Sequence, residues 1–188
     1  MELRNAVPGS IGTVGGSSVP TSRPRGDWYT EEHIRRSGMS WTFLRDNLYL
    51  DFVPALAEGG VVRGPAGDGR LSAVAQTDVA RSAVAVLRVP TDHAGKAYHL
   101  TGPEAFTLTE AATAITELTP ATVRFEDQAH EAAMASRAHH GAPCWQVEAS
   151  VSTCTATARG EMAEVSPDVE RLTGRRPVDL RELLTAEG

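Results

Sequence analysis

The chain has 188 residues, of which 41% are hydrophobic and 22% are charged, a balance that fits one globular domain and excludes a wholly disordered chain. Its net charge is −6 and Lys96 is its only lysine, which argues against a nucleic-acid partner because phosphate binding needs clustered basic residues. No apolar run approaches the ~20 residues of a membrane span and the N-terminus lacks the apolar core of a signal peptide, so we expect a cytoplasmic protein without a membrane partner.

The first residues of the chain contain a glycine-rich loop that is not followed by a predicted helix. Gly9, Gly12 and Gly15 have the G-x-x-G-x-x-G spacing of a dinucleotide phosphate loop, whose glycines let backbone amides approach a pyrophosphate. Such a loop needs a helix directly after it, because the positive end of that helix faces the anion. The residues that follow are Gly, Ser and Pro and do not favour a helix. We therefore predict a flexible arm with a relic loop over 1–26 and a folded domain over 27–188.

Helices and strands alternate over the rest of the chain. Acidic residues in its first turn, arginines in its last turn and Gly38 at its end predict a helix over 30–38. Apolar spacing and turn residues predict further helices over 47–57, 79–89, 107–118, 128–140, 145–164 and parts of 168–184. Strands are predicted over 41–45, 61–62, 71–74, 97–100 and 123–125. The pattern indicates an α/β fold with a few mixed strands and five or six helices.

Two helix starts are predicted in more detail. Thr77 and Asp78 are expected to cap the helix over 79–89. Thr107 and Glu110 have the spacing of a capping box, in which two side chains satisfy the first backbone amides of a helix. The buried stripe of the helix over 79–89 is expected to consist of Val79, Ala83, Val86 and Leu87.

Several segments carry a family likeness in chain order, namely residues 30–38, 41–49, 77–80, 98–104 and 169–175 with Pro177. They resemble the E-x-x-I-R-x-S-G-x-x-x-T-x-L-R-x-x-x-Y, x-D-V-A, Y-x-L-T-G-P-E and V-x-x-L-T-G-R-x-P patterns of NmrA-like proteins. These proteins are atypical, extended short-chain dehydrogenases/reductases, similar to NAD(P)H:quinone oxidoreductase type 2. The resemblance covers roughly residues 27–184.

The resemblance implies a partial Rossmann-like fold that corresponds to the substrate-side half of the family. Residues 7–16 are similar to the family's nucleotide loop, but about ten residues then join the loop to the next helix, where a nucleotide-binding half needs several β–α units. The implied reaction is hydride transfer from NAD(P)H to a quinone or carbonyl acceptor. We expect NAD(P) binding to this chain to be weak or lost.

Other functions stay open. A sheet edge left exposed by the missing units would favour a non-enzymatic regulatory or interaction module, including a homodimer. A lyase or isomerase that uses the family's substrate pocket without nicotinamide is a further alternative. Another is a decayed gene product without a folded function.

Candidate substrate-binding residues follow the strand over 41–45. Arg45, Asn47 and Tyr49 lie at its end, and ligands in open α/β sheets bind beyond the carboxyl ends of strands. The alternative is a surface pair between Arg45 and Asp46, with Tyr49 packed on the following helix. Short-chain dehydrogenases generally use a Tyr-x-x-x-Lys pair. When the chain is aligned with the family, the tyrosine position falls near Arg23 and the lysine position near Asp27, so no catalytic residue is identified.

The other chemistry-bearing side chains favour structural roles. Tyr29 is expected to be structural and His99 to make a cross-strand contact. Cys144 and Cys154 are expected to be reduced thiols, and they belong to no cluster with metal-ligand spacing. No metal site is predicted.

Overall fold

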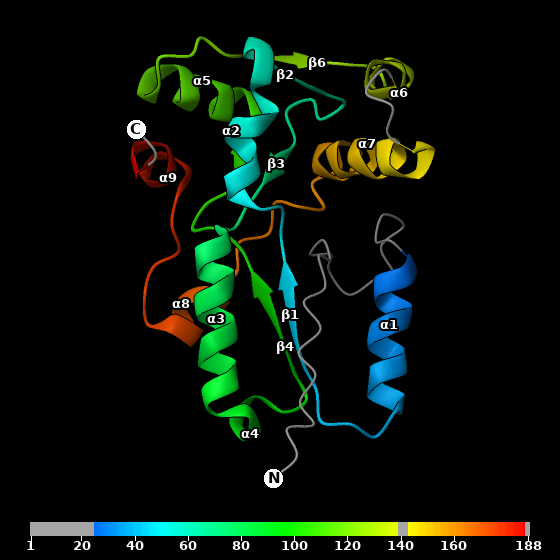
Figure 1. Ribbon diagram of the computed structural model, residues 1–188, viewed down its shortest axis with the longest axis vertical. Coiled ribbons are helices and arrows are strands. Elements are labelled where there is room, and N and C mark those ends of the chain that lie inside the picture. The colour runs from blue at the N-terminus through cyan, green and yellow to red at the C-terminus, as the bar shows by residue number, and fades with distance from the viewer. Residues whose placement is uncertain (1–24, 139–142, 187–188) are drawn as a thin grey trace.

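The computed structural model describes residues 25–138 and 143–186 (Figure 1). Its helices and strands are, in chain order, α1 (Arg25–Arg36), β1 (Thr42–Asp46), η1 (Leu50–Phe52), α2 (Val53–Leu56), η2 (Glu58–Gly60), β2 (Val61–Gly64), β3 (Arg70–Leu71), α3 (Gln76–Arg88), α4 (Pro90–His93), β4 (Lys96–Leu100), β5 (Phe106–Thr107), α5 (Leu108–Leu118), β6 (Arg124–Asp127), α6 (His130–Ala138), α7 (Cys144–Ala158), α8 (Asp168–Thr173) and α9 (Leu180–Ala186), where η marks a 3-10 turn.

The lower half of the molecule in Figure 1, here called the lower lobe, is built on the parallel strands β1 and β4. Helix α1 lies on one side of this pair, and α3 and α8 lie on the other (Figure 1). Side chains alternate between the two faces of a strand, so Leu44 and Leu100 pack with Val86 of α3 and Val169 of α8 in one apolar cluster. Burial of these side chains holds the two layers together.

The upper lobe contains the remaining elements, α2, β2, β3, β5, α5, β6, α6, α7 and α9 (Figure 1). Strands β2 and β6 pair in parallel and the two-residue strands β3 and β5 pair antiparallel. Leu71, Ile115, Met162 and Leu184 belong to the large apolar cluster of this lobe. The predicted α/β fold with a few mixed strands is confirmed.

The number of helices differs from the prediction. In the described ranges there are nine α-helices where five or six were expected. Two of them, α2 and α4, are four-residue turns with proline in the first turn, too short to give a periodic apolar pattern. The helix predicted over 47–57 begins only at Leu50, because Tyr49 is extended and forms a β-bridge with Val74.

One of the two predicted helix starts is confirmed and the other is wrong. At α5, the Thr107 Oγ1 atom accepts a hydrogen bond from the Glu110 amide at 3.0 Å, and the Glu110 carboxylate accepts one from the Thr107 amide at 2.8 Å. Helix α3 begins at Gln76, whose amide donates to the carboxylate of Asp51 at 2.8 Å. Asp78 lies inside α3.

The buried face of α3 also differs from the predicted stripe. Asp78 is buried and accepts a hydrogen bond from the Val178 amide at 2.7 Å, while Leu87 is 52% exposed. The reason is tertiary, since the segment before α9 reaches back to α3 and places a backbone N–H donor, that of Val178, against a position where the sequence pattern favours only apolar contacts. Among the described helices, none has the length and apolar content to cross a membrane.

Candidate functional site

The predicted substrate-binding residues lie where β1 ends and the chain leaves the lower lobe for the upper lobe. Arg45 is within β1, and Asn47 and Tyr49 follow it. Their side chains point in three different directions, because side chains alternate along the strand and the backbone turns after it. The structure brings the three residues to one end of the sheet but gives each a separate set of partners.

Arg45 points toward α1 and forms a bidentate ion pair with Glu31. Its Nε and Nη2 atoms donate to the two Glu31 carboxylate oxygens at 2.9 and 2.6 Å. Arg35 donates to the same carboxylate at 2.8 Å. Burial raises the pKa of the Glu31 carboxyl, but the hydrogen bonds and charge of Arg45 and Arg35 outweigh burial, so the pKa is lowered. The interpretation of Arg45 as a partner of Asp46 is wrong.

His99 completes this cluster from the neighbouring strand. It faces Arg45 across the β1–β4 register, with 3.2 Å between its Nε2 atom and Nη1 of Arg45. The predicted cross-strand contact is confirmed. The His99 backbone amide donates to Asp168 of α8 at 2.9 Å.

Asp46 and Tyr49 form a second pair on the opposite face of β1. The Tyr49 hydroxyl donates to Oδ2 of Asp46 at 3.2 Å, and Oδ1 of Asp46 is buried without a hydrogen-bond partner among the described residues. Burial raises the pKa of Asp46 to about 6, and the Tyr49 hydrogen bond only partly offsets this. Burial and the charge of Asp46 raise the pKa of Tyr49, which stays a hydroxyl donor at neutral pH. The Asp46 carboxyl therefore changes its protonation state at a pH near 6, while the Tyr49 hydroxyl keeps its proton.

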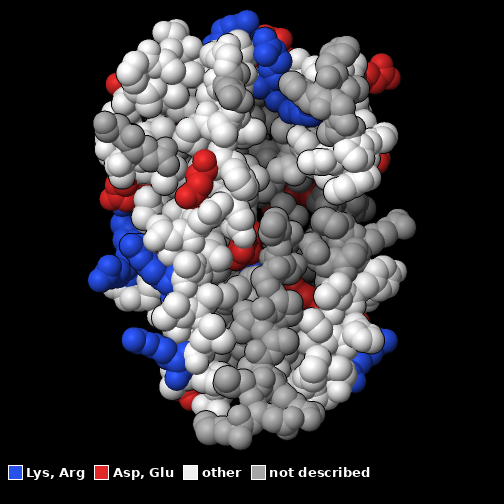
Figure 2. All heavy atoms as spheres, viewed as in Figure 1, with Lys and Arg blue, Asp and Glu red and all other residues white. Residues whose placement is uncertain are grey.

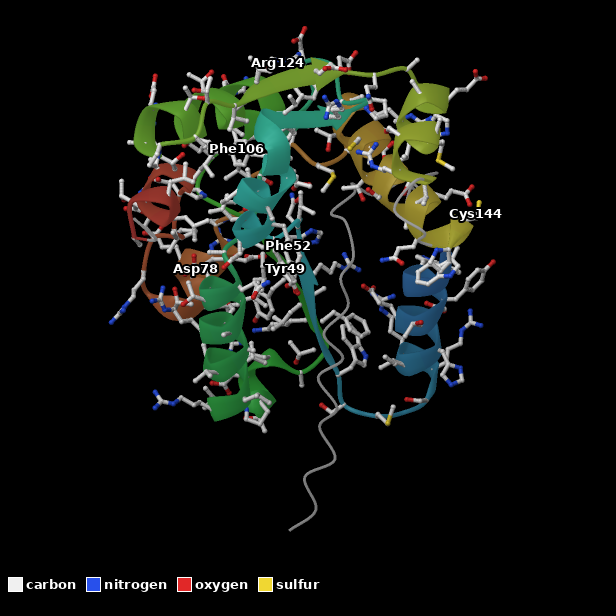
Figure 3. All side chains as sticks on the ribbon, turned by 45° about the horizontal axis from the view of Figure 1, so that its top comes forward. Tyr49, Phe52, Asp78, Phe106, Arg124 and Cys144 are labelled. Atoms are coloured by element: carbon white, nitrogen blue, oxygen red, sulfur yellow. The ribbon has the colours of Figure 1, made fainter. Side chains whose placement is uncertain are left out.

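The Tyr49 ring lies against an exposed apolar surface at the start of α3. Its centroid is 5.7 Å from that of Phe52, and Phe52 is exposed. Figure 3 shows the two rings together beneath α2. An aromatic pair beside an ionisable pair is a surface on which a flat, conjugated molecule can stack.

Asn47 connects the two lobes. It is 1% exposed, and its Nδ2 atom donates to Ser72 Oγ at 2.8 Å and to the Met162 carbonyl at 3.1 Å. Its Oδ1 atom accepts from the Leu48 amide at 2.7 Å. Ser72 in turn donates to the Glu164 carbonyl at 2.6 Å. These bonds position the end of β1 against the segment after α7, so Asn47 shapes the site from inside.

Sequence reasoning missed Glu31 and Asp46. Both are charged residues that the fold buries, and Asp46 lies on the same strand face as Leu44, two positions earlier. The alternation of a buried strand was the signal that could have found Asp46. For Glu31 the local signal is its i,i+4 spacing to Arg35 on α1, which does not indicate burial, because the second partner, Arg45, comes from another element.

The sequence singled out several other residues as candidates. Gly9, Gly12 and Gly15 lie outside the described residues. Tyr29 is 63% exposed and its ring contacts Trp28 edge-to-face. Cys144 and Cys154 are free thiols, as predicted. Among the residues that the structure describes, no three His, Cys, Asp or Glu side chains gather as metal ligands.

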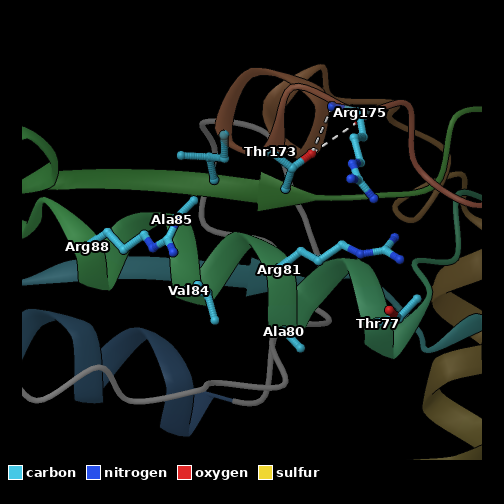
Figure 4. Close-up of a pocket in the computed structure, with 9 residues that line it drawn as sticks. Thr77, Ala80, Arg81, Val84, Ala85, Arg88, Thr173 and Arg175 are labelled. Carbon is cyan, nitrogen blue, oxygen red and sulfur yellow. Dashed lines mark hydrogen bonds between the residues drawn. The ribbon is translucent and has the colours of Figure 1, made fainter.

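A separate open groove lies between α3 and α8, away from the end of β1 (Figure 4). Its floor is apolar and includes Val84, and three arginines line it, namely Arg81, Arg88 and Arg175. Basic side chains also gather along this edge of the molecule in Figure 2. Arg81 is paired with Asp78 at 3.0 Å. The groove shares no lining residue with the site at β1.

Comparison with known proteins shows which proteins this chain resembles. No family model matches. The structure of an NADPH-dependent quinone oxidoreductase from Escherichia coli superimposes with a TM-score of 0.78 and 27% identity, over 87% of this chain and 60% of that one. NmrA, a negative transcriptional regulator solved with NADP, shares the fold with a TM-score of 0.63 and 13% identity. The chain is similar in fold to these proteins. The resemblance inferred from the sequence is thereby confirmed.

Curated relatives of this chain are reductases. A (4-alkanoyl-5-oxo-2,5-dihydrofuran-3-yl)methyl phosphate reductase from Streptomyces griseus is 36% identical over 150 residues, which is 77% of this chain and 52% of that protein. Quinone oxidoreductase 2 from Escherichia coli is 29% identical over 157 residues, 81% of this chain and 54% of that protein. The chain spans about half the length of the curated relatives it matches.

Proposed function

We propose that this chain is a shortened NAD(P)H-dependent reductase that acts on a small conjugated acceptor. The observation that carries the proposal is the 36% identity to a reductase over 150 residues. The printed names of the relatives specify a dihydrofuranone phosphate, a quinone and, for a Xenophilus azovorans protein that is 28% identical, an azo compound. Each is an unsaturated molecule that accepts hydride, so the substrate class proposed here is a planar, electron-poor acceptor such as a quinone or an enone.

The end of β1 is the proposed substrate site. Asp46 and Tyr49 supply a proton-exchanging pair there, and the Tyr49 and Phe52 rings supply an aromatic surface. Reduction of a quinone to the hydroquinone by one hydride requires one further proton. A tyrosine hydroxyl backed by a carboxyl group that titrates near pH 6 fits that requirement. Arg45 and Asn47 support the same strand end through Glu31 and Ser72.

NAD(P)H, when bound, supplies the hydride. None of the described residues forms a glycine-rich phosphate cradle at the end of β1. Gly9, Gly12 and Gly15 remain the proposed phosphate contacts. We propose that cofactor binding is weak, with a dissociation constant of about 1 mM, since the sequence after Gly15 does not favour the helix whose dipole a phosphate loop needs.

The test is a calorimetric titration of the full chain with NADPH and NADH, paired with NADPH oxidation in the presence of menadione as the quinone. We expect weak binding, slow menadione-dependent oxidation, and loss of both in Gly12→Val. The matched control is Ala121→Val, which changes an exposed residue of the upper lobe. Absence of binding heat at millimolar nucleotide together with absence of oxidation would reject the proposal.

A second candidate function rests on the free edge of β1. Among the described residues, β1 pairs with β4 on one side and with no strand on the other. An unpaired strand edge is a template for another strand, so we propose a homodimer that pairs along β1. Light scattering after size-exclusion chromatography tests it. A monomer at high concentration, unchanged by Phe43→Pro, would reject edge pairing.

A further inference from the structure

We propose that the upper lobe holds a subsite for the tail of the substrate, in a cavity between β2 and α7 where Arg137 binds an anionic head group. The inference rests on the proposed reductase function, because the tail is taken to belong to the reduced molecule. It names the substrate class more closely: a conjugated acceptor that carries a short apolar chain with an acidic group.

The cavity has a volume of about 160 Å³ and an apolar floor. Leu48, Val62, Leu71 and Leu108 line that floor. A cavity of roughly 150 Å³ with such a lining is known to accept benzene, so this one has room for a ring or a chain of about six carbons. Leu48 follows Asn47 directly, which places the cavity next to the segment that forms the proposed site.

Arg137 closes one side of the cavity and lacks a counter-charge. It comes from α6 and donates to Ser150 Oγ at 3.2 Å, to the Ala133 carbonyl at 3.1 Å and to the Arg63 carbonyl at 2.8 Å. All three acceptors are neutral, and no carboxylate of the described residues pairs with it. A guanidinium has five N–H donors, so two remain for a ligand, and a half-buried cation favours an anion.

Cys154 forms part of the wall between these groups. Its Sγ atom lies where a side chain on Gly64 would begin, 2.6 Å from the position of a Cβ. Burial raises the pKa of the Cys154 thiol, although Arg137 partly offsets this. The thiol therefore stays protonated and acts as an apolar surface, and Gly64 is needed to leave it room.

The ligand that fits this arrangement has an apolar body and a negative end. A neutral ligand would fill the floor but leave the guanidinium without its charge partner. The relative from Streptomyces griseus is named for a substrate with an alkanoyl chain and a phosphate, which combines the same two chemical features.

The test compares two probes with one tail and different heads, sodium hexanoate and 1-hexanol, by NMR titration of the full chain labelled with nitrogen-15. We expect hexanoate to bind about tenfold more tightly than hexanol, the size of one charge-assisted hydrogen bond. Arg137→Met should remove this difference and leave hexanol binding unchanged. Arg124→Met, which changes an exposed arginine of the same lobe, is the matched control and should keep the difference (Figure 3).

A second pair of variants tests the cavity itself. Cys154→Phe fills it and should abolish the binding of both probes, whereas Cys144→Phe changes an exposed cysteine of the same helix and should preserve binding. If Arg137→Met unfolds, Arg137→Lys keeps the charge and should keep the preference for hexanoate. Equal affinity for the two probes, no binding of either, or an equal loss of both in a folded Arg137→Met variant would overturn the inference.

The two proposals fail separately. Hexanoate binding without menadione-dependent oxidation would reject the reductase function and leave an anion-tail subsite. Oxidation without hexanoate binding would reject the subsite and leave the reductase function.

Discussion

At the scale of single residues, the chemistry at the end of β1 depends on one buried carboxyl group. Asp46 is 3% exposed, and among the residues that the structure describes only Tyr49 donates a hydrogen bond to it. Burial of a carboxylate with one donor disfavours its charged form. The residue was absent from the predicted site because neighbouring Arg45 suggested a surface ion pair, which the fold replaces with the pair between Arg45 and Glu31.

The raised pKa of Asp46 predicts how stability depends on pH. The pKa is about 6 in the folded chain against 3.8 for a free aspartate, so folding favours the protonated form. This contribution is complete below about pH 4 and is lost as the pH rises through 6, a change of about 2–3 kcal/mol. Asp46→Asn should flatten the profile over this interval and be more stable than the native chain at neutral pH. Urea unfolding across this pH range measures it, with the exposed Asp68→Asn as control.

An unchanged pH profile in Asp46→Asn would show that Asp46 is ionised throughout. The same result would remove the proton-exchanging role proposed for its pair with Tyr49.

The two cysteines should differ in reactivity toward a disulfide reagent. Cys144 is exposed, while Cys154 is half-buried and burial raises its thiol pKa. Because the thiolate is the reactive form, Cys154 should react about tenfold or more slowly. Comparing Cys144→Ser with Cys154→Ser in a thiol titration at mildly alkaline pH separates the two rates. Similar rates in the two variants would contradict the buried position of Cys154.

At the scale of elements, the sequence predicted features that depend on residues close together in the chain. It did not predict features that depend on contacts between elements. The capping box of α5 was predicted from Thr107 and Glu110 because both partners lie in one turn. The start of α3 was predicted wrongly because its partners, Asp51 and Val178, come from distant segments. Strands β1 and β4 were predicted from their apolar character, but their parallel pairing was not readable from either strand alone.

The capping box gives a prediction for α5. Thr107→Ala removes the acceptor for the Glu110 amide and should lower the free energy of unfolding by about 1 kcal/mol. Thr109→Ala, two residues further along the same exposed helix start, should change it by less than about 0.5 kcal/mol. Chemical unfolding of both variants measures the difference. Equal effects would mean that helix propensity, and not capping, decides the stability of this turn.

At the scale of the whole molecule, the resemblance of short motifs led to the fold. The family patterns were matched at residues 41–49 and 169–175, and these segments form β1 with the turn after it and α8 with its cap at Gly174. What the patterns did not contain is how the lobes join. That junction depends on Asn47 and Ser72, 25 positions apart in the chain.

Removing the side chain of Asn47 should therefore destabilise the whole molecule. Asn47→Ala leaves Ser72 and the Leu48 amide without their buried partner, and we expect a loss of about 2–3 kcal/mol. Urea unfolding followed by tryptophan fluorescence measures it, since Trp41 and Trp145 report on different lobes. Ser152→Ala, on the exposed face of α7, is the control. A loss below about 1 kcal/mol would show that packing alone joins the lobes.

The parallel pairing of β1 with β4 also has a kinetic consequence. Facing residues of the two strands, such as Arg45 and His99, are 54 positions apart in the chain, and α2, β2, β3, α3 and α4 lie between the strands. Bringing the strands together must close that long loop before any ladder bond forms, which costs chain entropy early and slows the search for the native state. Refolding of this molecule should therefore be slow for its size, with the lower lobe acquiring protected amides late.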